Sequence, residues 1–98
     1  MILTDALITK KQQLAKSIFS LSFETPSIAN LSKPGQFVNI LIDNCTLRRP
    51  FSICETTKNE IKIAFKVKGR GTKQMATWQV GKTINLLGPL GNGFFVPN

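Results

Sequence analysis

The run from Ile61 to Lys68 limits the fold of this chain more than any other feature. It reads IKIAFKVK, so apolar residues stand at the odd positions and lysine or alanine at the even ones. A period of two is typical of a β-strand that buries one face. We therefore expect a strand here whose lysines face solvent or a ligand.

Similar short patterns recur along the chain between turns that contain glycine or proline. Candidate strands occupy residues 6–18, as a long or bent pair, and residues 19–23, 36–42, 48–53 and 83–87. One helix is expected, from Thr72 as N-cap to about Gln79, with Met75 and Trp78 on one face as a plug for the barrel end. This order predicts an all-β fold, a small antiparallel barrel of five to seven strands with one short helix.

The composition excludes several kinds of chemistry. The chain of 98 residues, one domain by its length, has no histidine and five acidic residues, which show no paired arrangement. Hydrolase triads and histidine proton relays therefore cannot be assembled. Cys45 and Cys54 lack metal-ligand spacing, and we assign them no role. If the chain takes part in catalysis, a bound cofactor must supply the reactive group.

Charge and hydropathy narrow the choice of partners and location. The formal net charge is +8, which attracts nucleic acid, an acidic protein or a phosphorylated cofactor alike. No apolar run approaches the roughly 20 residues that cross a bilayer, and the first residues lack the order of a secretion signal. We expect a cytoplasmic protein.

The first binding motif is RRPFSI, residues 48–53. Pro50 biases Arg49 toward an extended backbone, so its guanidinium projects in a defined direction and suits a diphosphate. Phe51 and Ser52 then point to opposite faces, and can offer a surface and a hydroxyl to a planar ring. Taken alone, this stretch is better explained as an ordinary solvated pair of arginines.

The second motif, KGRGT, spans residues 68–72 and ends where the helix is expected to begin. Its glycines permit close backbone approach, and the free amides at a helix start attract anions. Thr72 could cap the helix and donate a hydrogen bond to phosphate. A plain loop and cap remains an alternative reading of this motif taken by itself.

Together the two motifs resemble the FAD-binding signatures of the ferredoxin-reductase-like flavoproteins, Arg-x-aromatic-Ser at 49–52 and Gly-x-x-Ser/Thr at 69–72. With PGQFV at 34–38 and GPLGNGF at 88–94, the set is similar to electron-transfer subunits of bacterial NAD-dependent dihydroorotate dehydrogenases. The resemblance covers nearly the whole chain. It implies a six-stranded antiparallel Greek-key barrel that binds FAD.

The resemblance also implies site residues and partners. The FAD contacts would come from three segments: Arg49, Pro50, Phe51 and Ser52; Ala64, Phe65 and Lys66; Gly71 and Thr72. In such proteins electrons pass between the FMN of a dihydroorotate dehydrogenase catalytic subunit, an iron-sulfur cluster, FAD and NAD, within a hetero-oligomer. The cluster ligands and the nucleotide domain lie beyond the flavin domain.

The sequence also predicts the extent of the domain and leaves two alternative functions open. Residues 1–98 form the barrel domain, and 88–98, rich in Gly, Asn and Pro, resemble a connector to an absent nucleotide-binding domain. One alternative is the FAD domain of another reductase, serving a hydrogenase or a ferredoxin-NADP reductase complex. The other is a basic barrel that binds nucleic acid through its lysines and phenylalanines.

Overall fold

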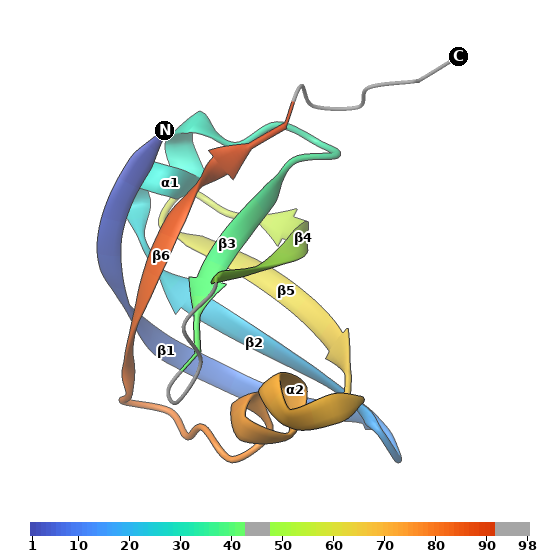
Figure 1. Cartoon of the computed structure of the whole chain (residues 1–98). Coiled ribbons are helices and arrows are strands. Elements are labelled where there is room, and N and C mark those ends of the chain that lie inside the picture. The colour runs from blue at the N-terminus through green and yellow to red at the C-terminus, as the bar shows by residue number, and fades with distance from the viewer. Residues whose placement is uncertain (43–47, 92–98) are drawn as a thin grey trace.

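Within residues 1–42 and 48–91, the part of the chain that the structure describes, six strands close into a barrel and two short helices cover its ends (Figure 1). The structure is a computed structural model. Its elements are β1 (Ile2–Ala15), β2 (Ile18–Glu24), α1 (Pro26–Leu31), β3 (Phe37–Leu41), β4 (Arg48–Thr56), β5 (Glu60–Lys66), α2 (Gly69–Met75) and β6 (Thr83–Leu90).

The strands follow one another around the barrel in the order β1-β2-β5-β4-β3-β6, and every neighbouring pair is antiparallel. Strands β3, β4 and β5 are consecutive neighbours, and β6 returns to lie beside β3. This arrangement is a Greek key. It confirms the expected six-stranded antiparallel barrel, and closure leaves the sheet without a free edge strand.

The interior is filled from both the strands and the helices. The largest fully buried side chains are Ile8, Leu21, Phe23, Ile28, Val38, Ile40, Ile42, Ile61, Ile63, Met75, Trp78 and Leu86. The alternation predicted for β5 is present, because Ile61, Ile63 and Phe65 are buried while Ala64 and Lys66 are exposed. Each buried isoleucine contributes roughly 1.5–3 kcal/mol of hydrophobic stabilisation.

The two helices close opposite ends of the barrel (Figure 1). Met75 of α2 is 0% exposed and Trp78, just after that helix, is 2% exposed, so both plug one end as predicted. Ile28 of α1 is buried at the other end. Helix α1 was not predicted, since Pro26 reads as a chain break, although proline is also favoured in the first turn of a helix.

Several boundaries differ from the sequence prediction: the pair expected over residues 6–18 is the single strand β1, β4 extends to Thr56, and α2 and β6 differ as well. Helix α2 begins at Gly69 and ends at Met75, and its N-cap is Lys68 rather than Thr72. Strand β6 continues to Leu90, so residues 88–90 belong to the barrel and the expected connector would begin later. Cys45 and residues 92–98, which include most of the expected connector, lie outside the described residues. No described helix is long and apolar enough to span a membrane.

An ion pair crosses the paired half of β4 and β5. Lys62 Nζ lies 2.8 Å from Glu55 Oε1, and the two residues are partners in the strand register. The hydrogen bond and the charge of Lys62 lower the pKa of the Glu55 carboxyl below its ordinary value, and Glu55 raises the pKa of the Lys62 amine. Both side chains are accessible to water, so this pair is a minor contribution to stability.

Replacing Met75 with alanine is expected to lower the free energy of unfolding by about 2–5 kcal/mol, because the substitution opens a cavity at a fully buried site. Urea titration followed by the fluorescence of Trp78 measures the change. The control is Val80→Ala, whose side chain is 58% exposed and whose effect should stay within about 0.5 kcal/mol. Equal losses in the two variants would contradict the assigned barrel plug.

Glu55 also predicts a pH dependence. Its folded-state pKa is lowered, so its stabilisation is present above the unfolded-state pKa and is lost as the pH falls through the folded-state value. Between about pH 6 and pH 3, Glu55→Gln should lose less stability than the parent chain does. Urea midpoints across this range test the point, with Glu24→Gln as a control carboxylate for which no ion pair occurs in the described residues. Parallel pH profiles for the parent and Glu55→Gln would refute it.

Candidate flavin-binding site

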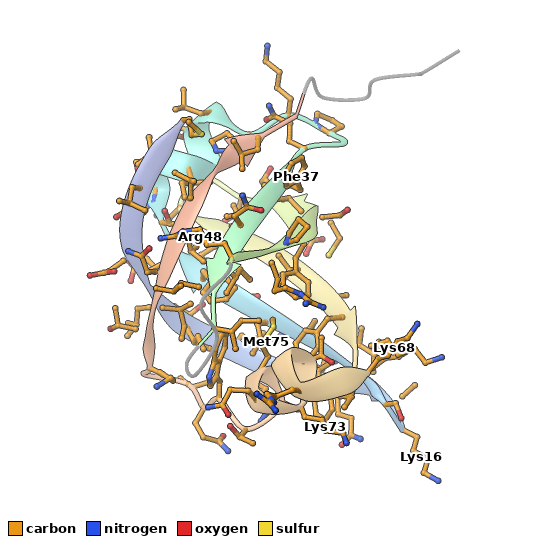
Figure 2. All side chains as sticks on the ribbon, viewed as in Figure 1. Lys16, Phe37, Arg48, Lys68, Lys73 and Met75 are labelled. Carbon is orange, nitrogen blue, oxygen red and sulfur yellow. The ribbon has the colours of Figure 1, made fainter. Side chains whose placement is uncertain are left out.

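Arg48, the first residue of β4, is held by its neighbours on the outside of the barrel (Figure 2). Its guanidinium donates to Asn39 O at 3.5 Å and to the Asn85 side-chain oxygen. Asn85 in turn donates from Nδ2 to Asp5 Oδ1 at 2.9 Å. This network ties β4 to β3, β6 and β1, so Arg48 has a structural role.

Arg49 lies on the other face of the strand and is exposed. Among the described residues its guanidinium makes no hydrogen bond and no ion pair. Its strand partner is Ile40, which is fully buried, so the backbone that carries Arg49 is anchored in the barrel wall. The structure therefore presents a fixed backbone whose guanidinium has no partner within residues 1–42 and 48–91.

Strand β4 separates from β5 next to this arginine. The first residues of β4 pair only with β3, and pairing with β5 begins at Ile53, which lies opposite Ile63. Ile53 N–H donates to Gln36 O at 3.0 Å, so alternation along the strand turns the N–H of Ser52 toward the β5 side. Beyond the Ile53–Ile63 pair, that side is open.

The facing end of β5 is open in the same way. Val67 N–H donates to Ser17 O at 2.7 Å, so alternation turns the backbone groups of Lys66 toward β4, where the described strands offer no ladder partner. Pro50 fits this arrangement because a proline lacks an N–H and is tolerated where a strand is unpaired. Strand-edge donors and acceptors of this kind suit the polar edge of a planar heterocycle.

The predicted side chains divide between the two faces of these strands. Pro50, Ser52, Ala64 and Lys66 are exposed. Phe51 is half-buried and packs edge-on against Phe65, with ring centroids 6.2 Å apart. The prediction that Phe51 and Ser52 face opposite sides is confirmed by this burial.

Phe65 is different from its neighbours because its side chain is 5% exposed and belongs to the core. Its ring stacks on Phe19 at a centroid distance of 6.0 Å and also meets Phe51 edge-on. Any direct contribution of Phe65 to a ligand would have to come from its backbone, and its ring supports the strands that border the opening.

The first turn of α2 follows the open end of β5 almost directly along the chain. Thr72 Oγ1 accepts a hydrogen bond from Lys68 N–H at 2.5 Å and donates to Lys68 O at 2.7 Å. The prediction of Thr72 as N-cap is therefore wrong, because Lys68 is the cap residue and the Thr72 hydroxyl reaches back to it from the fourth position of the helix. Its hydroxyl proton is engaged, so the backbone of this turn is the part that can donate to an anion.

Two glycines shape this turn. Gly69 has a φ of +82°, which disfavours residues with a side chain. A Cβ atom on Gly71 would lie 3.2 Å from Ile42 Cδ1, so glycine allows α2 to approach the end of β3 closely. The end of β3 also carries Ile40, the strand partner of Arg49. Through these contacts the first turn of α2 and Arg49 lie at the same end of the barrel.

The charges reinforce this end of the molecule. Exposed cations gather around α2 and the nearby β1–β2 turn, as Figure 2 shows for Lys16, Lys68 and Lys73. Lys66 at the end of β5 and Arg70 of α2 are further exposed cations. Glu24 and Glu60, strand partners in the β2–β5 register, lie at the other ends of β2 and β5. A field of this sign favours a polyanion at the α2 end.

Two surface pockets lie elsewhere. One is lined by Lys10, Ser22, Glu55, Thr57, Glu60, Ile61 and Lys62, and the other by Lys33, Pro34, Ile53, Cys54, Glu55 and Thr56. Neither contains any residue predicted to bind the cofactor. The opening between β4 and β5 is an unpaired strand edge rather than a cavity. No group of three or more potential metal ligands occurs among the residues that the structure describes.

Sequence reasoning did not separate the roles of the two arginines and did not find the parting of β4 from β5. The only local signal for the opening was Pro50 inside a strand pattern. The partner of Arg48, Asn85, is 37 residues away in sequence, so no local pattern identifies it.

A Greek-key barrel with an arginine that is unpartnered among the described residues, an open strand edge and a helix start at one basic end suits the class of proteins that bind a flavin dinucleotide. The family model described as "Oxidoreductase FAD-binding domain" matches residues 5–95. The chain belongs to this family of oxidoreductase FAD-binding domains.

Individual relatives agree with this family. The "Dihydroorotate dehydrogenase B (NAD(+)), electron transfer subunit" of Bacillus cereus (strain G9842) is 38% identical over 93 residues, 90% of this chain and 36% of that protein. The protein of the same name from Bacillus anthracis (strain A0248) is 37% identical over 93 residues, with the same shares of the two chains. The chain thus spans about a third of the length of these curated relatives.

Solved structures show the same fold. An NADH-dependent reduced ferredoxin-NADP oxidoreductase superimposes with a TM-score of 0.85 at 31% identity, covering 90% of this chain and 33% of that one. A ferredoxin reductase in carbazole 1,9a-dioxygenase gives a TM-score of 0.83 at 25% identity, covering 99% of this chain and 32% of that one.

The different roles of the two arginines predict different effects on stability without any ligand. Arg48→Ala should lower the free energy of unfolding by about 1–3 kcal/mol, because Asn85 and the Asn39 carbonyl lose a charged partner. Arg49→Ala should change it by less than about 0.5 kcal/mol, since that side chain is exposed. Urea titrations of the two variants compare them directly, and the reverse order would contradict the assignment.

Proposed function

We propose that this chain is the FAD-binding barrel of an electron-transfer flavoprotein subunit. In the full-length protein it would relay electrons between an iron-sulfur and FMN-containing partner and NAD during dihydroorotate oxidation in pyrimidine biosynthesis. The family match and the names of the curated relatives support this proposal. The FMN-containing catalytic subunit, the hetero-oligomer, the connector to a nucleotide-binding domain and the cytoplasmic location belong to the same proposal.

The observation that carries the proposal is the position of Arg49. Its guanidinium, which has no partner among the described residues, belongs to the part of β4 that has parted from β5, and the first turn of α2 lies at the same barrel end. A planar donor fork and a set of backbone amides are complementary to the two phosphates of a dinucleotide. A mononucleotide with one phosphate would satisfy only part of this set.

The residues of the chain would divide the ligand between them. Arg49 and the free backbone amides at the start of α2, up to Gly71, would hold the pyrophosphate, and Thr72 would fix this turn through its contacts with Lys68. Ser52, with the strand edge of residues 64–66, would orient the polar edge of the isoalloxazine ring, and Pro50 and Phe51 would fix the strand that carries Ser52. The cations of α2 would lower the cost of bringing the phosphates to this surface.

When bound, FAD supplies oxidation and reduction, because none of the predicted site residues carries a redox-active side chain. The chain has no histidine and five acidic residues, and the described acids Asp5, Glu24, Glu55 and Glu60 are not among the residues that border the opening. Its own contribution is to bind the cofactor, to orient the ring and to hold the phosphates in a basic field. We assign no proton-transfer step to a side chain.

A nucleic-acid-binding barrel is less well supported. Stacking of bases requires aromatic rings that are accessible to solvent. The phenylalanines at positions 19, 23, 37, 51 and 65 are buried or half-buried, so the described surface offers no stacking platform. An FAD domain from another reductase subunit would use the same site. Only the identity of the partner protein would distinguish that function from the proposed one.

Replacing Arg49 with alanine is expected to weaken FAD binding by about 1.5–3 kcal/mol, the range for a charge-assisted hydrogen bond. Binding of riboflavin, which has no phosphate, should change little. Quenching of flavin fluorescence during titration measures both affinities. The matched control is Lys58→Ala, which removes an exposed cation from the β4–β5 turn at the other end of these strands.

An unchanged FAD affinity in Arg49→Ala would remove Arg49 from the site. Equal weakening of FAD binding by Lys58→Ala would show that the effect of Arg49→Ala comes from net charge alone. Failure of the parent chain to quench or shift the flavin spectrum at any concentration would overturn the FAD assignment itself.

A further inference from the structure

Lys11 is set apart from its neighbours by two specific contacts. Its Nζ donates to Ala76 O at 2.7 Å, across 65 positions of sequence, and the same amine lies 5.5 Å from the centre of the Phe19 ring. Its side chain is half-buried, whereas those of Lys10 and Lys16 are exposed. We infer that Lys11 is a positioning residue for the flavin site, an inference that rests on the proposed function.

The first contact fixes the end of α2. Ala76 is the C-cap residue of that helix, where backbone carbonyls lack partners within the helix. A cation at this place satisfies a carbonyl and interacts favourably with the negative end of the helix. Because α2 has only seven residues, restraint at its last turn also restrains its first turn, which carries Gly71 and Thr72.

The second contact continues through the barrel wall. Phe19 stacks on Phe65 with centroids 6.0 Å apart and ring planes inclined by 22°. Phe65 then meets Phe51 edge-on, with centroids 6.2 Å apart and ring planes inclined by 69°. Each of these geometries is a favourable aromatic or cation-aromatic contact. The series runs from Lys11 to the residue that precedes Ser52.

The two contacts converge on the two sides of the same opening. Through Ala76, Lys11 restrains the helix that would hold the pyrophosphate. Through the three phenylalanines it restrains the strands that would orient the ring. The amine therefore keeps the phosphate side and the ring side of the site at a constant separation, which a dinucleotide of fixed length requires.

The test compares Lys11→Met with Lys11→Arg in the 98-residue chain. Methionine keeps an unbranched apolar stem but loses the donor and the charge, whereas arginine keeps both. We expect Lys11→Met to raise the Kd for FAD about three- to tenfold, the effect of one net hydrogen bond. We also expect the residual fluorescence of the saturated flavin to rise, and Lys11→Arg to restore both quantities at least in part.

Lys10→Met is the matched control, since it removes a neighbouring exposed cation. It should leave both the Kd and the fluorescence of the saturated complex near the parent values. Residual fluorescence reports the surroundings of the bound ring, so a loss of folding stability alone would not change it at saturation.

Three outcomes overturn the inference: an unchanged Kd and fluorescence in Lys11→Met, the same changes in Lys10→Met, or lower stability with unaltered flavin properties. If Lys11→Met does not fold, Phe19→Leu decides, since it removes the ring under the amine and leaves Ala76 in place. Altered flavin fluorescence in that variant supports the inference, and unaltered fluorescence refutes it. A parent chain that binds no FAD would instead refute the proposed function.

Discussion

The end of the β4–β5 ladder at Ile53 and Ile63 is the constraint on which the rest of the site depends. A closed barrel normally satisfies the backbone hydrogen bonds of its wall internally and offers a ligand little besides side chains. Here β4 continues along β3 alone, and the facing backbone of Ser52 and Lys66 is left for another partner. Pro50 can stand inside the strand because no ladder bond is required of it on that side.

The surroundings of this opening divide structural and binding roles between adjacent residues. Arg48 is tied to Asn39 and Asn85, and this anchor leaves Arg49 on the other face with no partner in the described part of the chain. Met75 of helix α2 closes one end of the barrel. The close approach of Gly71 to Ile42 brings the first turn of α2 to the barrel end where Arg49 lies. One set of packing contacts thus builds the core and places the groups that face the ligand.

Much of this could be predicted from local patterns. The period-two alternation of apolar residues located β5, and the two motifs identified Arg49, Ser52 and the glycine turn as candidate site residues. Each of these signals lies within a few residues of sequence. The parting of β4 from β5, the Arg48–Asn85 contact and the Lys11–Ala76 contact depend on residues far apart in sequence, which a local pattern does not contain. The predicted N-cap of α2 was wrong because the helix begins at Gly69, a glycine with a positive φ, three residues before the expected Thr72.

A nuclear magnetic resonance titration of the ¹⁵N-labelled chain tests the central claim most directly, with FAD, riboflavin and ADP compared in turn. The account predicts that riboflavin shifts the amide signals of Ser52 and Lys66, that ADP shifts those of residues 70–72 together with the Arg49 side chain, and that FAD shifts both sets. Amides near Glu24 and Glu60, at the other end of the barrel, should stay unchanged. Shifts that avoid the β4–β5 opening, or a pyrophosphate response away from Arg49 and α2, would contradict it.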